Sequence, residues 1–336
     1  MTPRLMGSHQ GGTGMKAVRI HQFGGPEVLQ IEDVPTPEPG SGQVGVRLEV
    51  CGVNFADVYQ RLGQYALQLP GIPGQEGAGV VDTVGPGVTD VRPGDRVVYS
   101  NVVGSYAQYA IVPAWQLVPI PPGLDTATAV AAMLQGMTAH YLVHDTYPLK
   151  PTDTALVYAA AGGVGHLLVQ MARRRGARVI AAVSSDAKAQ LARSLGANEA
   201  IVYTRDEVDA EAKGLTGGRG VQVVYDSVGK DTFEKSLNCL ALRGMMVLYG
   251  QSSGPVPPQD PQILNRKGSL FLTRPTIVHY THTREELLAR ANDVFSWVQS
   301  GILRVRIDRR FPLAQAAEAQ RYLQSRQATG KVLLLP

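Results

Sequence analysis

The sequence has few cysteines, few aromatic residues and no long apolar run. Its two cysteines, Cys51 and Cys239, are too few for a disulfide framework or a cysteine metal cage, and they favour a reducing compartment. No apolar segment approaches the roughly 18 to 20 residues that span a bilayer. No basic block exceeds the arginines at 173–175, so the net charge of +4 does not indicate nucleic-acid binding. We therefore expect a globular cytoplasmic protein without membrane or nucleic-acid partners.

The chain is long enough for two domains. With 336 residues, of which 44% are hydrophobic, each of two domains can bury its own core. The first residues, MTPRLMGSHQGGTG, lack the apolar stretch of a signal peptide, and we interpret residues 1–14 as a disordered leader or tag. The folded chain is expected to begin at Met15.

Two patterns of predicted secondary structure follow one another along the chain. Up to about residue 134, short β-like segments such as MKAVRI and QVGVRLEV are separated by turns rich in proline and glycine, and a helix is predicted over 125–143. From about 154 to 275, apolar runs alternate with amphipathic helices, which indicates a parallel sheet with crossover helices. We therefore predict an α/β fold, in which a doubly wound Rossmann sheet is inserted into a β-rich domain.

The C-terminal residues 277–336 resemble the first region more than the middle one. Their sequence predicts a helix over 285–300, a strand over 303–311, a helix over 313–325 and a last strand in GKVLLLP. The expected domains are residues 15–137, residues 138–276 for the cofactor, and residues 277–336, which complete the first domain.

A glycine-rich turn, AAAGGVG, lies between the apolar run TALVY and a helix expected to begin near Val164. In a strand–turn–helix context, small residues let the backbone approach a pyrophosphate, whose charge the helix N-terminus stabilises. Gly165 would allow close packing of helix on strand, although Ala160 occupies the first glycine position. A tight turn of purely structural purpose is the alternative. We expect the pyrophosphate to lie against Ala161, Gly162, Gly163, Val164 and Gly165.

The end of the next strand indicates which dinucleotide is bound. NAD sites usually carry an acidic residue there, which accepts from the ribose 2′-OH. This chain has Ser184 and Ser185 instead, followed by Lys188, and hydroxyls with a cation suit the 2′-phosphate of NADPH. Asp186 argues against NADPH, because an acidic residue there is typical of NAD sites, unless it serves as a helix cap.

Several motifs together resemble a known family. They are GGPEVL, GVNFADVY, PGQEGAGVV, GDRVVY, AAAGGVG, VVYDSVG and SLFLTRP. In this order they resemble the zinc-independent quinone oxidoreductases, the zeta-crystallin branch of the medium-chain dehydrogenases/reductases, over nearly the whole chain from Met15. The resemblance implies a Rossmann domain inserted into a GroES-like catalytic domain, with the active site in the cleft. It also implies a homodimer, formed through the sheet edge near GMMVLYG and SLFLTRP.

The positions of the catalytic zinc ligands of alcohol dehydrogenases carry other residues here. Asn54 stands at the first cysteine, Gln75 replaces the histidine before Glu76, and no second cysteine occurs around 134–138. We predict that no metal is used. His140, His144 and His166 are assigned structural roles on helices.

Without a Lewis acid, hydride addition to an electron-poor acceptor such as a quinone is favoured over carbonyl reduction, and positioning supplies much of the rate. Asn54 resembles the family residue near the nicotinamide ribose and the acceptor. Tyr65 could donate a hydrogen bond or a proton to the developing quinol oxygen. Asp57 either orients Asn54 or Arg61, or caps a helix.

The resemblance implies further cofactor contacts. Tyr203 could instead merely finish a strand, Arg274 could form an internal ion pair, and Lys331 either reaches the phosphates or is solvated. The residues concerned are Thr138, Tyr203, Ser227, Tyr249, Gly250, Ser252, Leu272, Arg274 and Lys331.

The predicted activity is NADPH-dependent reduction of quinones. The alternatives are NADPH-dependent reduction of conjugated enones or enoyl thioesters and, from a different class, a non-catalytic structural role. The loop sequence RLGQYALQLPGIPG offers little charge beyond Arg61 for the carrier of an enoyl thioester.

Overall fold

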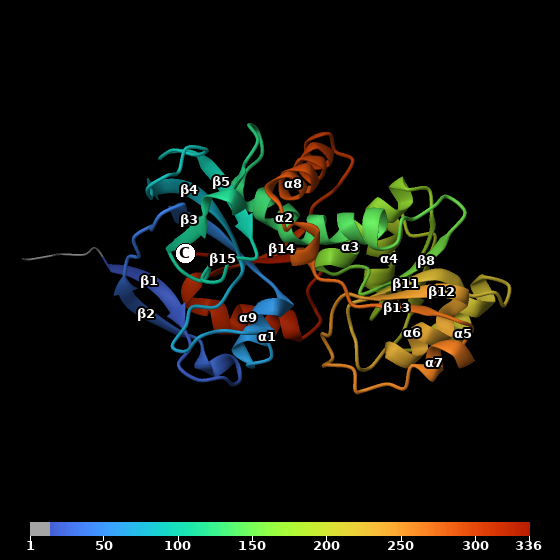
Figure 1. Cartoon of the computed structure of the whole chain (residues 1–336). Coiled ribbons are helices and arrows are strands. Elements are labelled where there is room, and N and C mark those ends of the chain that lie inside the picture. The colour runs from blue at the N-terminus through green and yellow to red at the C-terminus, as the bar shows by residue number, and fades with distance from the viewer. Residues whose placement is uncertain (1–13) are drawn as a thin grey trace, which may run out of the picture.

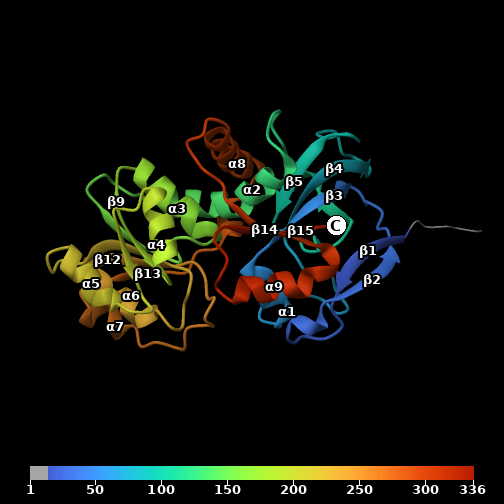
Figure 2. The same ribbon diagram turned by 180° about the vertical axis from the view of Figure 1, so that it is seen from behind.

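The computed structural model describes residues 14–336 and has two lobes (Figures 1 and 2). One lobe is built on a six-stranded parallel sheet and the other on a seven-stranded, mostly antiparallel sheet. Of the expected leader, residues 1–13 lie outside the described residues, and Gly14 already belongs to the first strand. None of the helices in residues 14–336 is long and apolar enough to cross a membrane.

The six-stranded sheet confirms the predicted doubly wound fold. Its strand order is β10-β9-β8-β11-β12-β13, and every pair is parallel, so the order reverses between β8 and β11. Its strands are β8 (Thr154–Tyr158), β9 (Arg178–Val183), β10 (Glu199–Val202), β11 (Val221–Asp226), β12 (Leu240–Leu248) and β13 (Phe271–Thr273).

Two groups of helices cover the two faces of this sheet (Figure 1). One apolar cluster packs α3 (Gly163–Arg174) and α4 (Asp186–Ser194) on one face. A separate cluster packs the other helices on the opposite face. These are α5 (Val208–Leu215), α6 (Phe233–Cys239) and α7 (Gln262–Arg266).

The seven-stranded sheet joins the two ends of the chain. Its order is β14-β15-β3-β4-β5-β7, and β6 pairs with β3. The C-terminal strand β15 runs antiparallel to β3, with Leu334 opposite Cys51, so the tail lies beside the residues that follow β3. The strands are β3 (Gln43–Val53), β4 (Glu76–Val84), β5 (Arg96–Ser100), β6 (Tyr109–Pro113), β7 (Val118–Pro119), β14 (Ile307–Pro312) and β15 (Lys331–Leu335).

Smaller elements complete this lobe. Strands β1 (Gly14–Arg19) and β2 (Gln30–Pro35) form an antiparallel pair. Helix α1 (Phe55–Arg61) follows β3, and α9 (Ala316–Gln324) precedes β15. The predicted helix over 313–325 begins with a 3₁₀ turn (Leu313–Gln315), and the strand predicted from 303 begins only at Ile307.

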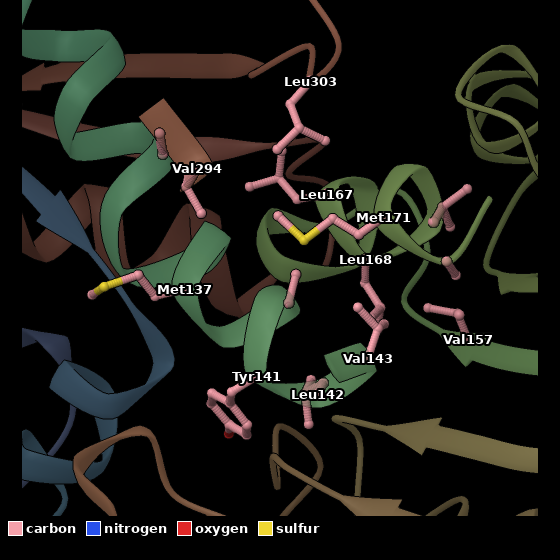
Figure 3. Close-up of a cluster of buried hydrophobic side chains, with 14 of the residues drawn as sticks. Met137, Tyr141, Leu142, Val143, Val157, Leu167, Leu168, Met171, Val294 and Leu303 are labelled. Atoms are coloured by element: carbon pink, nitrogen blue, oxygen red, sulfur yellow. The ribbon is translucent and has the colours of Figure 1, made fainter. Parts of the chain in front are cut away.

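Helix α2 (Thr126–Tyr141) connects the lobes and packs against α3 and α8 (Arg284–Gln299). Asp125 caps it through a hydrogen bond from the backbone N–H of Thr128, and a π-helical turn (Leu142–Thr146) extends its end. Its buried side chains form an apolar cluster with α3 and α8, which includes Met137, Leu167 and Val294 (Figure 3). This packing fixes the parallel sheet against the other lobe.

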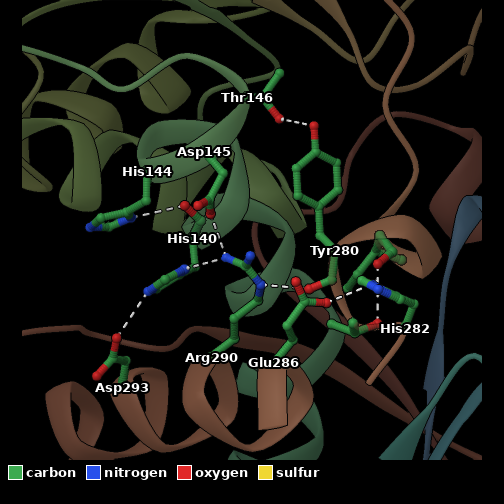
Figure 4. Close-up of polar contacts among 11 residues, drawn as sticks. His140, His144, Asp145, Thr146, Tyr280, His282, Glu286, Arg290 and Asp293 are labelled. Carbon is green, nitrogen blue, oxygen red and sulfur yellow. Dashed lines mark hydrogen bonds and ion pairs between the residues drawn. The ribbon is translucent and has the colours of Figure 1, made fainter. Parts of the chain in front are cut away.

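A polar network outside this core holds the end of α2 against α8 (Figure 4). His140 and His144 stack with ring centroids 4.2 Å apart, and His140 Nε2 lies 3.1 Å from Asp293 Oδ2. Arg290 donates a 2.6 Å hydrogen bond to Asp145. Burial lowers the pKa of His140 to about 4, so the ring is neutral. The two histidines thus have the structural role expected of them.

Candidate active site

A cavity of about 880 Å³ lies between the two lobes. It is walled on one side by the carboxyl ends of strands in the parallel sheet and on the other by residues around α1 and the C-terminal segment. Ligands of doubly wound folds bind at this edge of the sheet, at the reversal of strand order. The cavity has the size of a site for a small molecule or cofactor.

The glycine-rich turn forms the part of the wall that follows β8. Ala159 has a positive φ of 49°, its carbonyl accepts a 2.8 Å hydrogen bond from the N–H of Gly162, and α3 begins at Gly163. A Cβ on Gly165 would lie 2.1 Å from the carbonyl oxygen of Ala159. Only glycine therefore allows this closeness of helix and strand, and the first turn of α3 faces the cavity with free N–H groups.

The residues expected at the 2′-phosphate divide into two groups. Ser184, Lys188 and Tyr203 line the cavity. Ser185 does not line it, because this residue is the N-cap of α4 and its hydroxyl accepts from the N–H of Lys188. Asp186 is the first residue of α4 and forms an ion pair with Arg205 at 3.4 Å. The expectation for Ser185 is therefore corrected, since helix capping occupies its hydroxyl.

Arg326 is a lining residue that the sequence did not single out. It follows α9 with a φ of 61°, and its carbonyl accepts a 2.5 Å hydrogen bond from Lys188 Nζ. Its guanidinium lies 3.5 Å from Asp231, which belongs to the loop after β11. Because an arginine near the end of the chain has no local signature, only the tertiary fold reveals it beside Lys188.

Asn54 lines the cavity from the other lobe. It is the N-cap of α1, and its backbone N–H donates a 2.8 Å hydrogen bond to Asp57 Oδ2. Its amide Nδ2 donates to Glu76 at 3.1 Å, and its Oδ1 accepts from Lys331 at 2.8 Å. Both expectations for Lys331 need correction, because its side chain is entirely buried behind Asn54, neither solvated nor lining the cavity.

Asp57 also lies behind the wall rather than in it. Its side chain is buried, and its Oδ2 accepts a second hydrogen bond, of 3.0 Å, from the hydroxyl of Tyr106. Burial raises the pKa of Asp57 to about 7, and hydrogen bonding from Asn54 opposes that rise. A catalytic role in contact with the acceptor is therefore not supported. The contacts agree with the capping alternative, because Asp57 accepts from the backbone N–H of Asn54 at the start of α1, while the amide of Asn54 pairs with Glu76 and Lys331.

Two tyrosines form an aromatic wall near Asn54. The rings of Tyr59 and Tyr65 meet edge to face with centroids 5.1 Å apart, and both residues line the cavity. The Tyr59 hydroxyl accepts a 3.3 Å hydrogen bond from the N–H of Gln251, which belongs to the loop after β12. Burial raises the pKa of Tyr59. A neutral phenol beside a second aromatic ring suits a planar acceptor.

Most other expected contacts line the cavity, and one does not. Leu272 lies on the edge strand β13 with 40% of its surface exposed and outside the cavity wall, so the expectation for its side chain is corrected. None of the three residues of β13 lines the cavity, and the wall includes only the residues that follow this strand, beginning with Arg274. The expected residues that do line the cavity are Thr138, Ser227, Tyr249, Gly250, Ser252 and Arg274.

The donor set around Asn54 does not fit a zinc ion. The amide of Asn54 is engaged by a lysine ammonium and a carboxylate, and neighbouring Gln75 offers another amide. Cys51 is buried and donates a 2.7 Å hydrogen bond to the carbonyl of Ser105. Within residues 14–336, no group of three histidine, cysteine or acidic side chains is arranged to hold a metal.

Comparisons with known proteins agree with this geometry. Residues 40–122 match the family model of the alcohol dehydrogenase GroES-like domain, and residues 163–294 match that of the zinc-binding dehydrogenases. A quinone oxidoreductase of Pseudomonas aeruginosa is 45% identical over 96% of this chain and 99% of its own length. A 2-haloacrylate reductase of a Burkholderia species is 44% identical over 95% of this chain and 98% of its own length.

A solved structure extends the likeness to the cofactor-bound state of a relative. Escherichia coli quinone oxidoreductase complexed with NADPH is 41% identical, with a TM-score of 0.94 over 96% of this chain and 100% of that chain. The chain belongs to the quinone oxidoreductases of the zeta-crystallin branch of the medium-chain dehydrogenase/reductase superfamily.

Proposed function

We propose that this protein is an NADPH-dependent quinone reductase. The observation that carries the proposal is one continuous cavity, whose wall includes Ser184, Lys188 and Tyr203 from one lobe and Asn54 and Tyr65 from the other. The first group offers hydroxyls and an ammonium group to a phosphate. The second group offers an amide and a phenol to the oxygen of an acceptor. NADPH, when bound, supplies the hydride.

The protein's own residues bind, orient and shelter the reactants. The turn at Gly162–Gly165 presents backbone N–H groups to the pyrophosphate, and Lys188 favours a 2′-phosphate by charge. Tyr59 and Tyr65 supply aromatic rings against which a planar acceptor packs. The Tyr65 hydroxyl donates a hydrogen bond or proton to the quinone oxygen as negative charge develops there. Because the quinone delocalises that charge, no Lewis acid is needed.

A second candidate is reduction of a double bond conjugated to a carbonyl or carboxylate. The relative named 2-haloacrylate reductase supports it. So does Arg274, an exposed residue that follows β13 and lines the cavity. Burial raises the pKa of Tyr59, and the charge of Arg274 opposes that rise. A guanidinium at that place would bind a carboxylate. Arg61, the charge noted in the α1 segment, is buried and does not line the cavity, so it offers nothing to a thioester carrier.

Assembly and location complete the proposal. Strand β13 is an edge of the parallel sheet, and Leu242, Phe271 and Leu272 are exposed there, which suits a homodimer joined through this edge.

Two buried free cysteines suit the cytoplasm. The proposed division is residues 15–137 and 277–336 for the catalytic domain and 138–276 for the NADPH domain, as the composition of the two sheets suggests.

The experiment is a comparison of NADPH oxidation with a naphthoquinone, with acrylate and with an enoyl thioester. The fastest turnover is expected with the quinone. Turnover of acrylate alone would select the second candidate. NADPH binding without turnover of any acceptor would favour a structural role.

A further inference from the structure

A charged pair without solvent exposure lies behind the part of the cavity wall formed by Asn54. The side chains of Lys331 and Glu76 are both 0% exposed. Lys331 Nζ donates hydrogen bonds to Glu76 Oε2 and to Asn54 Oδ1. The other carboxylate oxygen of Glu76 accepts a 2.8 Å hydrogen bond from the N–H of Leu134 in α2. The pair thus connects β15, β4 and α2 directly behind one lining residue.

The backbone makes room for this pair. A Cβ on Gly52 would lie 2.1 Å from Glu76 Oε2 and 2.8 Å from Lys331 Nζ. Any side chain at this position of β3 would therefore displace the charged groups. A buried ion pair is costly to desolvate and is weak evidence for stability by itself. Its position against Asn54 suggests a role in the cavity wall.

The pair determines which way the Asn54 amide points. An ammonium group can only donate and a carboxylate can only accept, so the amide oxygen must face Lys331 and the amide nitrogen must face Glu76. If the amide were flipped, its NH₂ group would face the Lys331 ammonium and its oxygen would face the Glu76 carboxylate. Neither hydrogen bond could then form. The second N–H of Nδ2 has no partner within residues 14–336, and Asn54 lines the cavity.

We propose that Lys331 is a positioning residue, which together with Glu76 holds the Asn54 amide so that one N–H is offered to an oxygen atom in the cavity. This inference rests on the proposed function for the identity of the occupant. The oxygen is a hydroxyl of the ribose next to the nicotinamide or the carbonyl of the acceptor, and both accept the same hydrogen bond. Lys331 then acts on the reacting end through Asn54 and never touches the cofactor phosphates.

A double-mutant cycle tests this coupling. Lys331→Met and Asn54→Ala are each expected to lower kcat/KM for a quinone about tenfold, the effect of one lost hydrogen bond in a sheltered site. Their combination is expected to be no worse than Asn54→Ala alone, because both remove the same donor. Lys16→Met, which removes an exposed lysine of β1, is the control and should be neutral. Fully additive effects of the two substitutions would overturn the proposal.

A second variant separates positioning from stability. Lys331→Met/Glu76→Gln removes both buried charges, and replacing a buried pair by neutral groups is often tolerated. The carboxamide introduced by Glu76→Gln could pair with the Asn54 amide in either orientation, so we expect a normal Tm with the same loss of kcat/KM. Wild-type kcat/KM in this variant would refute the positioning role.

The Kd for NADPH, measured by fluorescence without an acceptor, identifies the oxygen. A raised Kd in Lys331→Met/Glu76→Gln assigns the N–H of Asn54 to the ribose. An unchanged Kd with a lowered kcat/KM assigns it to the acceptor, and either result supports positioning. An unchanged Kd with unchanged kinetics contradicts it. Failure of the proposed function is a separate outcome, namely wild-type protein that binds NADPH and reduces no quinone.

Discussion

Lys188 Nζ, on the helix after the second strand of the parallel sheet, donates a hydrogen bond to the backbone carbonyl of Arg326, which lies 138 positions further along the chain. Both residues line the same end of the cavity. Burial lowers the pKa of Lys188, while the charge of Asp308 raises it. An incoming 2′-phosphate would therefore meet an ammonium group that the fold already holds in place.

Replacing Lys188 by alanine should raise the KM for NADPH about tenfold, because a sheltered, charge-assisted hydrogen bond contributes roughly 1.5 to 3 kcal/mol. The kcat should barely change, since the phosphate is remote from the hydride and binds the ground and transition states alike. The KM for NADH, which has no 2′-phosphate, should be almost unaffected. Steady-state kinetics with both cofactors measures this, and equal small effects on the two would show that Lys188 makes no phosphate contact.

Gly165→Ala should weaken NADPH binding and lower the free energy of unfolding by about 1 to 3 kcal/mol, since its Cβ would lie 2.1 Å from the Ala159 carbonyl oxygen. Backbone must move to relieve that contact. Gly214→Ala is the matched control, because its Cβ would meet nothing within 4 Å on helix α5. The control should be neutral or slightly stabilising. The free energy of unfolding, from denaturant titration, and the Kd for NADPH are measured for both variants. Equal values for Gly165→Ala and Gly214→Ala would contradict the role of Gly165.

Asp57→Asn should change how stability depends on pH. The pKa of Asp57 is about 7 in the folded protein and near 3.8 when unfolded, so between these values only the native state holds the proton. The wild type should therefore lose stability as pH rises from about 4 to about 7, by up to about 1.4 kcal/mol per pH unit. Asparagine has no such proton to lose.

The measurement is Tm at pH 5 and at pH 8 for the wild type and Asp57→Asn. The Tm of the variant, relative to the wild type, should be higher at pH 8 than at pH 5. Asp82→Asn, which removes an exposed carboxylate of β4, is the matched control. If the difference in Tm between Asp57→Asn and the wild type is the same at pH 5 and at pH 8, burial does not raise the pKa of Asp57.

Tyr65→Phe should lower kcat for quinone reduction about tenfold or more, because the phenol that donates to the quinone oxygen is lost. The Kd for NADPH should stay within about twofold, since this hydroxyl serves the acceptor. Tyr109→Phe removes a hydroxyl on β6 outside the cavity and should leave kcat unchanged. A wild-type kcat in Tyr65→Phe would leave stacking as the only contribution of this residue.

Local patterns predicted the fold and much of the site. The turn at 159–165 combines a strand, small residues and a helix within one short segment, so its place at the cavity followed from sequence alone. The adjacent serines show the limit of such patterns. Ser184 lines the cavity and Ser185 caps α4, and which serine becomes the cap depends on where the helix starts.

The remaining errors concern residues whose neighbours are distant in sequence. The sequence left Lys331 either at the cofactor phosphates or in solvent, because nothing near it in the chain reveals that β15 pairs with β3 and places it against Glu76, 255 positions away. Arg326 escaped notice for the same reason. The expectation for Leu272 is wrong because the cavity wall begins only at Arg274, after β13 has ended, which the sequence SLFLTRP does not reveal.

The most direct test of the proposed function is the initial rate of NADPH oxidation by the purified protein with a naphthoquinone, compared with that for an unactivated ketone of similar size. The quinone should be reduced at least about a hundredfold faster, because delocalisation in the quinone replaces the charge stabilisation that a metal would provide. The preference should persist with a strong chelator present. Equal rates for the ketone and the quinone would contradict an active site that relies on an electron-poor acceptor.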